Sequence, residues 1–253
     1  MKLPLHLEHV LKESGLAPDS PALLRAVLAR PGFRRFAFRF LRLRFTPTIL
    51  ERIRALDLPL DERAELFTSA ISFINVHETY KTTGRDRTRL VDEAILALAQ
   101  GMDNPTVLDV GVSDGTASLN LVRRMNGRGA VILADRHPFF HRAGPRAAHL
   151  VLDGDRRLLG VRVLGLYLNL ALAKRLARMR MTPISTVNPL VEATLGVNPI
   201  RAFDITRDAL DTPVAFIKCA NVLNRKYFGD DGVRAAAANM ARSLVPGGLL
   251  FLS

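Results

Sequence analysis

The sequence contains no tryptophan, three tyrosines and a single cysteine among its 253 residues. That cysteine, Cys219, cannot form a disulfide within the chain, so nothing points to an oxidising compartment. No run reaches the roughly 18 apolar residues of a membrane-spanning helix, and the nearest, 158–173, carries Arg162 and Asn169. Residues 1–15 include acids where a signal peptide needs an apolar run. We therefore expect a cytoplasmic protein, and the 48% apolar content is enough for an ordinary globular core.

The sequence has fewer acidic residues and far fewer lysines than arginines. The chain has 36 Lys and Arg against 24 Asp and Glu, a net charge of +12, and only six of the cations are lysine. The excess lies in residues 1–60 and 136–181. It favours nucleic acid, an anionic surface or an acidic protein as a partner, through segments 33–45 and 136–181. The alternative is that arginine only keeps the surface solvated.

Segment 33–45, FRRFAFRFLRLRF, repeats phenylalanine and arginine at helical spacing. One interpretation is a core-facing helix with a basic outer face. The other is a contact with RNA or with an anionic membrane. The basic apolar stretch 164–181 leaves the same two interpretations open.

Two apolar patterns divide the chain. Helical spacing between Pro and Gly stops predicts a helical N-terminal region over 1–100, with one helix beginning at Ser20-Pro21. Over 101–253, short apolar runs alternate with helices, which is typical of an α/β fold with a parallel sheet. The predicted strands are 106–110, 131–134, 200–203, 214–220 and 249–252. Residues 138–199 interrupt this pattern with a hairpin around 154–155, and we interpret them as an insertion that caps the sheet's carboxyl edge.

The segment TVLDVGVSDGTASL, residues 106–119, joins a predicted buried strand to a predicted helix. Asp109 lies near the end of the strand, and Gly111, Ser113 and Gly115 follow in the loop. Glycines at the carboxyl end of a strand let a ligand approach the backbone closely. The dinucleotide fingerprint G-x-G-x-x-G and the phosphate-binding G-K-[ST] are absent, which disfavours a pyrophosphate cradle. The acid in the loop favours a cationic or hydroxyl-rich ligand.

Three further polar residues follow predicted strands. Asp135 ends the second strand, where a carboxylate can accept two hydrogen bonds from a ribose, or it only terminates the strand. Asp204 ends the third strand and is either a ligand or a helix cap. Asn221 follows the fourth strand and either contacts cofactor or substrate or caps a helix. Cys219 is interpreted as a small buried apolar residue.

Taken in this order, with the Pro-Gly-Gly turn before the last strand, these segments resemble class I S-adenosylmethionine-dependent methyltransferases. That family's first motif is an acid followed by spaced glycines, with Ser113 here in place of a middle glycine. The resemblance implies S-adenosyl-L-methionine as cofactor and a Rossmann-like sheet of strand order 3-2-1-4-5. The residues it implies for cofactor binding are Asp109, Gly111, Ser113, Gly115, Asp135, Asp204 and Asn221.

Residues 218–253 also resemble the matching stretch of chemotaxis receptor methyltransferases. In the complete family fold, a helix and two strands follow the Pro-Gly-Gly strand, and this sequence stops before them. The apolar run 249–252 would then lie at an open sheet edge. Either the chain is truncated or another chain covers that edge in an oligomer.

The function indicated is methyl transfer from S-adenosylmethionine to an unidentified acceptor. One alternative is a protein-carboxylate methyltransferase. Another is a basic module on a degenerate or truncated methyltransferase fold that binds nucleic acid or lipid. No residue is identified as catalytic: the polar cluster HETYKTTGR, 77–85, lies either over the cofactor or in a solvated loop. His137, His141 and His149 lack metal-ligand spacing, so no metal is expected.

Overall fold

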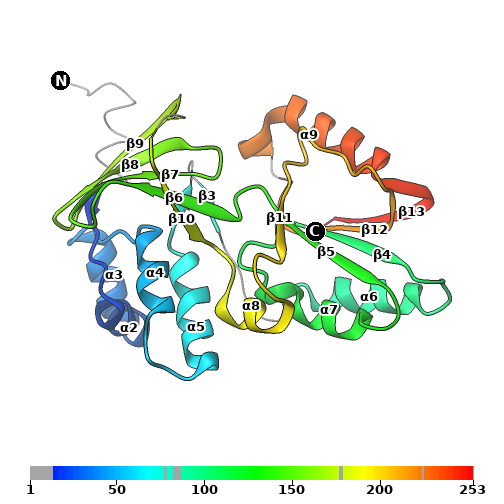
Figure 1. The fold of residues 1–253 in the computed structure, drawn as a ribbon, viewed down its shortest axis with the longest axis horizontal. Coiled ribbons are helices and arrows are strands. Elements are labelled where there is room, and N and C mark those ends of the chain that lie inside the picture. Colours follow the sequence, from blue (N-terminus) through cyan, green and yellow to red (C-terminus); the bar gives the residue numbers. More distant parts are fainter. Residues whose placement is uncertain (1–13, 77–78, 82–86, 177–178, 224, 253) are drawn as a thin grey trace. The chain divides into compact units, whose positions relative to one another are not determined.

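The structure is a computed structural model that describes residues 14–76, 79–81, 87–176, 179–223 and 225–252. It divides into two compact units (Figure 1). Unit 1 comprises Met1–Thr82 and Phe139–Leu190, and unit 2 comprises Thr83–Pro138 and Val191–Ser253. None of the described helices is long and apolar enough to cross a membrane.

Unit 1 combines helices with an antiparallel sheet (Figure 1). Its helices are α2 Pro21–Ala29, α3 Pro31–Arg39, α4 Thr48–Arg54 and α5 Leu60–Ile71. Its six-stranded sheet has the order β1-β9-β8-β7-β6-β10. The strands are β1 Gly15–Leu16, β6 Phe139–Ala143, β7 Ala148–Leu152, β8 Arg157–Val163, β9 Leu166–Arg175 and β10 Thr182–Ser185. A separate short pair is formed by β2 Asn75–Val76 and β3 Thr79–Tyr80.

Local signals set several of these elements. The Ser20 hydroxyl accepts a hydrogen bond from the Leu23 N–H at 3.2 Å, and Pro21 occupies the first turn of α2, as predicted. The hairpin predicted around residues 154–155 is confirmed, because β7 and β8 pair antiparallel on either side of it. The stretch 164–181, which could have been a helix, is largely the strand β9.

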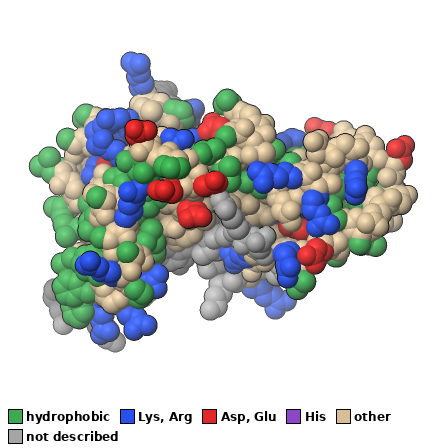
Figure 2. All heavy atoms as spheres, turned by 90° about the horizontal axis from the view of Figure 1, so that it is seen from below, with side chains coloured by type: hydrophobic (Ala, Val, Ile, Leu, Met, Phe, Trp, Pro, Cys, Tyr) green, Lys and Arg blue, Asp and Glu red, His purple; other side chains and the backbone are tan. Residues whose placement is uncertain are grey.

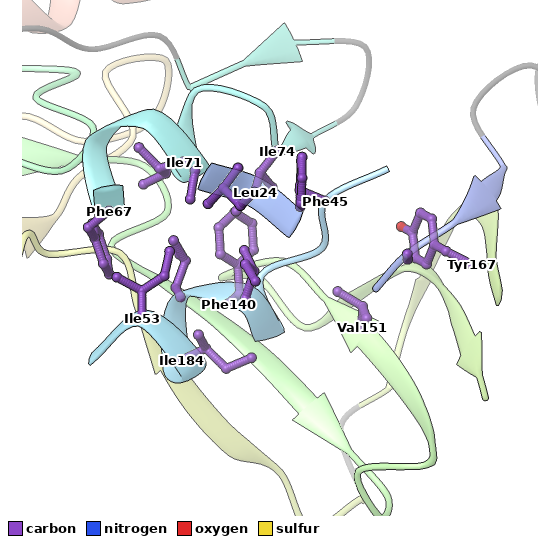
Figure 3. Packing of buried hydrophobic residues seen from close by; sticks show 14 of the residues in the cluster. Leu24, Phe45, Ile53, Phe67, Ile71, Ile74, Phe140, Val151, Tyr167 and Ile184 are labelled. Carbon is purple, nitrogen blue, oxygen red and sulfur yellow. The ribbon is translucent and has the colours of Figure 1, made fainter. Parts of the chain in front are cut away.

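The core of unit 1 joins the N-terminal helices to the strands of residues 139–185. Leu24, Ile53 and Phe67 from the helices lie in one buried cluster with Phe140 and Val151 from the sheet (Figure 3). The helices alone would expose this apolar face, and the strands cover it. Residues 139–190 are therefore the second layer of the N-terminal unit and not an insertion confined to the second domain. The predicted boundaries, 1–100 and 101–253, need this correction.

Some arginines of the basic segment 136–181 are used inside unit 1. The Arg162 Nη1 atom lies 3.0 Å from Asp19 Oδ2, and the Arg162 side chain is buried. The Arg142 Nε atom lies 3.5 Å from Glu51 Oε2. Part of this segment's positive charge is thus neutralised by acids of the N-terminal region and does not reach the surface uncompensated.

Unit 2 has the predicted α/β architecture with a parallel sheet. Its strands are β4 Thr106–Val110, β5 Ala130–Asp135, β11 Ile200–Ala202, β12 Val214–Cys219 and β13 Leu244–Leu252. They run in the order β11-β5-β4-β12-β13, and every neighbouring pair is parallel. Numbered along the chain, this is the order 3-2-1-4-5.

Helices cover both faces of that sheet (Figure 1). The helices of unit 2 are α6 Arg89–Ala99, the short 3₁₀ turn η1 Thr116–Ser118, α7 Leu119–Met125 and α9 Arg225–Arg242, while α8 Pro189–Leu195 spans the boundary between the units. Alternate strand residues point to opposite faces. Val107 packs with Ile95 of α6, while its neighbour Leu108 packs with Met240 of α9. The prediction that places α6 in the N-terminal region is therefore wrong, because α6 belongs to unit 2 and packs against its sheet.

The strand β13 forms one edge of the sheet and pairs with β12. Leu249, Leu250 and Leu252 are between 37% and 56% exposed along it. Within the described residues, the apolar run 249–252 therefore lies on an edge strand of the sheet of unit 2.

Candidate functional site

The loop after β4 has an unusual backbone. Gly111, Ser113 and Gly115 all have positive φ values, of 74°, 58° and 82°. Glycine adopts this left-handed region freely, whereas serine does so at a cost. The spacing of the sequence motif therefore reflects the conformation of the loop, and Ser113 takes the backbone shape of the glycine that it replaces. Sequence reasoning identified all three positions.

Asp135 fixes this loop to the end of the neighbouring strand. Its Oδ2 atom accepts a hydrogen bond from the Ser113 N–H at 2.9 Å, and its Oδ1 atom accepts one from the His137 N–H at 2.8 Å. The Gly111 N–H also donates to the Ala134 carbonyl at 2.8 Å. Asp135 is buried. The carboxylate thus shapes the loop by accepting hydrogen bonds from the residues on either side of the strand end.

Asp109 lies beneath the loop, in a buried ionic network. Its Oδ2 atom accepts hydrogen bonds from Lys218 Nζ at 2.8 Å and from the Ser118 hydroxyl at 2.7 Å. Lys218 Nζ also lies 2.7 Å from Asp92 Oδ1. Lys218 and Asp109 are paired residues on the adjacent strands β12 and β4, and Asp92 comes from α6. The network ties the strand that precedes the loop to the turn η1 that follows it.

The ionisation of this network follows from its burial. Asp92, Asp109 and Lys218 are each exposed by 3% or less. Burial raises the pKa of Asp92 above its ordinary value, and Lys218 only partly offsets this effect. Burial opposes the charged form of Lys218, but Asp109 and Asp92 outweigh it and raise the pKa of the lysine. Lys218 is therefore a structural cation held by two carboxylates.

Asp204 occupies a turn after β11. Its Oδ1 atom accepts hydrogen bonds from the Thr206 N–H at 3.0 Å and hydroxyl at 2.7 Å, and its Oδ2 atom lies 3.3 Å from Arg136 Nε. Burial opposes ionisation, but the Thr206 hydrogen bonds and the charges of Arg136 and Arg207 prevail and lower the pKa of Asp204. Asp204 therefore holds a turn rather than the start of a helix, and it is linked by charge to the residue after Asp135.

Asn221 follows β12 and is exposed, with a left-handed φ of 56°. The next residue, Val222, packs against the first glycine of the loop. A Cβ atom on Gly111 would lie 2.2 Å from Val222 Cγ2, so only glycine fits there. The loops after β4 and β12 therefore meet where the strand order reverses, which is where open α/β sheets bind their ligands.

Of the seven predicted site residues, Gly111, Ser113, Gly115 and Asp135 form one hydrogen-bonded loop. Asp109 lies below this loop, while Asp204 and Asn221 follow the strands β11 and β12. Sequence reasoning missed Asp92, Ser118 and Lys218. The sequence did hold one indication of this network, Lys218 inside the apolar strand 214–219, because a buried cation needs an acidic partner. Most of the predicted cluster 77–85 lies outside the described residues.

Cys219 is buried next to Lys218, as expected for a structural cysteine. Burial and the neighbouring Asp109 charge raise the pKa of its thiol to about 12. At about pH 8, only about one thiol in ten thousand is then ionised and reactive. We expect iodoacetamide to label Cys219 only after the chain is unfolded, as mass spectrometry can show. Rapid labelling of the folded chain would contradict this burial.

No protein-family model and no curated protein matches the chain. Several solved structures are similar to it, and two of them are methyltransferases. One is an S-adenosylmethionine-dependent methyltransferase from Geobacter sulfurreducens in complex with S-adenosyl-L-homocysteine, at 15% identity and a TM-score of 0.34, covering 78% of this chain and 55% of that one. The other is coclaurine N-methyltransferase bound to N-methylheliamine and SAH, at 13% identity and a TM-score of 0.34. That match covers 92% of this chain and 58% of the other one. The chain spans just over half the length of both.

Proposed function

We propose that unit 2 binds S-adenosyl-L-methionine at the carboxyl ends of β4 and β5 and that the chain transfers its methyl group to an acceptor. One observation carries the proposal: the left-handed loop 111–115 is held by a carboxylate at the end of the next strand. The sequence motifs from 106 to 135 supply the resemblance to class I methyltransferases. The parallel sheet and the reversal of strand order beside the loop support this location.

The residues present fit the cofactor at two places. Asp135 is a carboxylate at the end of the second strand, where the methyltransferase resemblance places the acid that binds the two ribose hydroxyls, and it lies at the edge of the loop that it fixes. The loop around Ser113 offers backbone polar groups for the methionine end. Asp109 acts from below as a positioning residue, since Lys218 and Ser118 engage its carboxylate. Asp204 acts through Arg136, and Asn221 lies at the exposed end of β12.

The chemistry of methyl transfer places few demands on the protein. When bound, the cofactor supplies a methyl group on a sulfonium centre, which a nucleophile displaces in line. The loop and Asp135 bind and orient, so that an acceptor atom can reach the methyl carbon at about 3–3.5 Å. The buried Asp92–Lys218–Asp109 network holds β4 and η1 in place and so preserves the loop between them.

Asp135→Ala should weaken binding of S-adenosylmethionine by more than tenfold. The substitution removes the hydroxyl acceptor and also leaves the Ser113 and His137 N–H groups without their partner. Calorimetric titration with the cofactor and with its demethylated product measures the effect. The matched control is Asp211→Ala, which removes an exposed acid from the same unit and should leave the affinity unchanged. Unchanged affinity in folded Asp135→Ala would disprove this assignment.

The acceptor class requires a second experiment. Incubation with cofactor carrying a tritiated methyl group, together with protein and small-molecule fractions, shows where the label goes. Label released from protein by mild base would identify a carboxylate ester and support the protein-carboxylate alternative. Base-stable label would place the methyl group on nitrogen or another atom.

A further inference from the structure

The surface of α2 and α3 in unit 1 carries positive charge without acidic compensation. Between Ser20 and Leu50 the sequence has seven arginines and no Asp or Glu. Within the described chain, five of these arginines are exposed and form no ion pair: Arg25, Arg30, Arg34, Arg35 and Arg39. They differ in this from Arg142 and Arg162, whose charges are paired inside the unit. The charge of α2 and α3 is therefore available to an external partner.

Large apolar side chains are exposed among these arginines. Phe36 is 47% exposed, Phe40 68% and Leu41 41%, while Ala37 on the same helix is fully buried. In Figure 2, hydrophobic and basic side chains lie side by side at the lower left, with no acidic ones among them. We call the exposed side chains of residues 25–41 the Arg–Phe surface. Exposed phenylalanines at helical spacing, flanked by cations, indicate an interaction surface for another molecule or a membrane.

We propose that the Arg–Phe surface docks unit 1 onto a membrane that contains anionic lipid. Phenylalanine and leucine side chains insert at the boundary between headgroups and acyl chains, and arginines pair with lipid phosphates around them. The helix α3 has nine residues, too few to span a bilayer, so its contact is interfacial. The proposal is independent of the methyl-transfer function of unit 2.

The same features disfavour RNA and a second copy of the chain as the partner of the Arg–Phe surface. RNA binding through aromatic residues needs free ring faces for stacking. The Phe36 and Phe40 rings lie 5.4 Å apart, and the Arg39 guanidinium lies 5.8 Å above the Phe40 ring. Leu41 offers no stacking surface at all. A second copy of the chain would bring like-charged arginines face to face, which costs association energy.

Vesicle flotation with the full chain tests the proposal. We expect the protein to float with vesicles of phosphatidylcholine containing about 30 mol% phosphatidylserine, and not with phosphatidylcholine alone. Raising the salt from about 0.1 M to about 0.5 M should weaken the binding, because it screens the arginines. Failure to bind the anionic vesicles at low salt would overturn the proposal, as would equal binding to both vesicle types.

Two double variants, each with a matched control, locate the contact. Arg34→Ser/Arg35→Ser should weaken vesicle binding about thirtyfold, since each arginine contributes about fivefold near an anionic surface. Its control is Arg123→Ser/Arg124→Ser, an adjacent pair of exposed arginines on α7. Phe36→Ser/Phe40→Ser should weaken binding at least tenfold. Its control is Leu90→Ser, which removes an apolar side chain that is 76% exposed on α6.

The controls decide between a local site and a general charge effect. If the α7 pair weakens binding as much as the α3 pair, net charge alone is responsible and the proposal fails. Circular dichroism and thermal unfolding establish that each variant is folded, as expected for exposed substitutions. Tight binding of polyuridylate by the Arg–Phe surface without vesicle binding would identify RNA as its partner. A dimer that the Phe36→Ser/Phe40→Ser variant dissociates, again without vesicle binding, would identify a second copy.

Discussion

Replacing Lys218 with methionine should lower the free energy of unfolding by about 3–5 kcal/mol. The Lys218 Nζ atom lies 2.7 Å from Asp92 and 2.8 Å from Asp109, and all three side chains are almost completely buried. Methionine has a similar length and no charge, so it leaves two carboxylates together without their counter-ion. Equilibrium unfolding in urea measures the loss. Arg128→Met, which removes an exposed cation from the same unit, is the control and should change stability by less than about 0.5 kcal/mol.

Acidification should partly restore the Lys218→Met variant. Burial already raises the pKa of Asp92, and loss of Lys218 removes the main interaction that lowers it. A group whose pKa is raised on folding contributes stability below its unfolded pKa, and that contribution is lost as pH rises through the folded pKa. The deficit of Lys218→Met relative to the native chain should therefore shrink as the pH is lowered from about 7 toward the unfolded carboxyl pKa of about 4. A deficit that stays constant over this range would show that packing, and not charge, accounts for the loss.

A neutral network provides the complementary test. Asp92→Asn/Asp109→Asn/Lys218→Met removes all three charges and should recover most of the stability lost in the single lysine variant, because no buried charge remains unpaired. We attribute the stability that the triple variant does not recover to imperfect packing and to the changed hydrogen bond between Ser118 and residue 109. A triple variant that is less stable than Lys218→Met would contradict the electrostatic explanation.

The fold of unit 2 was accessible from sequence because its signals are local. Each strand is a short apolar run that ends at a polar residue or a turn, as at Asp135, and helical patterns separate the runs. Alternation of this kind restricts the topology to a parallel sheet with helices on both faces. The one element assigned to the wrong region, α6, has a clear helical pattern. Periodicity shows that a helix buries a face but does not say which sheet covers it.

Unit 1 was not accessible because its sheet and helices come from distant parts of the chain. The buried face of Phe67 and Leu24 is covered by Phe140 and Val151, more than seventy positions away. No local spacing encodes such a pairing. The sequence therefore predicted the hairpin around 154–155 correctly and placed its segment in the wrong domain.

The candidate site shows the same division between local and non-local information. Positive φ at Gly111, Ser113 and Gly115 is a property of a short segment, and the spacing of the motif marked these three positions. The roles of the acids depend on what lies across the sheet. The resemblance implied cofactor binding by Asp109, and the structure adds that its neighbour on β12 is Lys218, which sequence spacing does not reveal.

Gly111→Ala should destabilise the chain much more than Gly127→Ala, although both glycines have nearly the same backbone. Their φ values are 74° and 76°, so each substitution costs about 1–2 kcal/mol for the left-handed conformation. A Cβ atom at Gly127 meets nothing within 4 Å, whereas at Gly111 it would lie 2.2 Å from Val222 Cγ2. Overpacking there adds about 1–3 kcal/mol. Urea unfolding of the two variants measures the difference.

Val222→Ala separates the steric cost from the backbone cost. In the Gly111→Ala/Val222→Ala double variant the clashing methyl group is gone, so the overpacking should disappear while the left-handed strain remains. The two substitutions should therefore be non-additive, with the double variant more stable than Gly111→Ala alone, as expected for residues in direct contact. Additive losses would show that the loops after β4 and β12 do not meet at Gly111. If they do meet there, Gly111→Ala should also weaken S-adenosylmethionine binding, and the double variant should recover part of it, because the contact holds the loop that the cofactor would use.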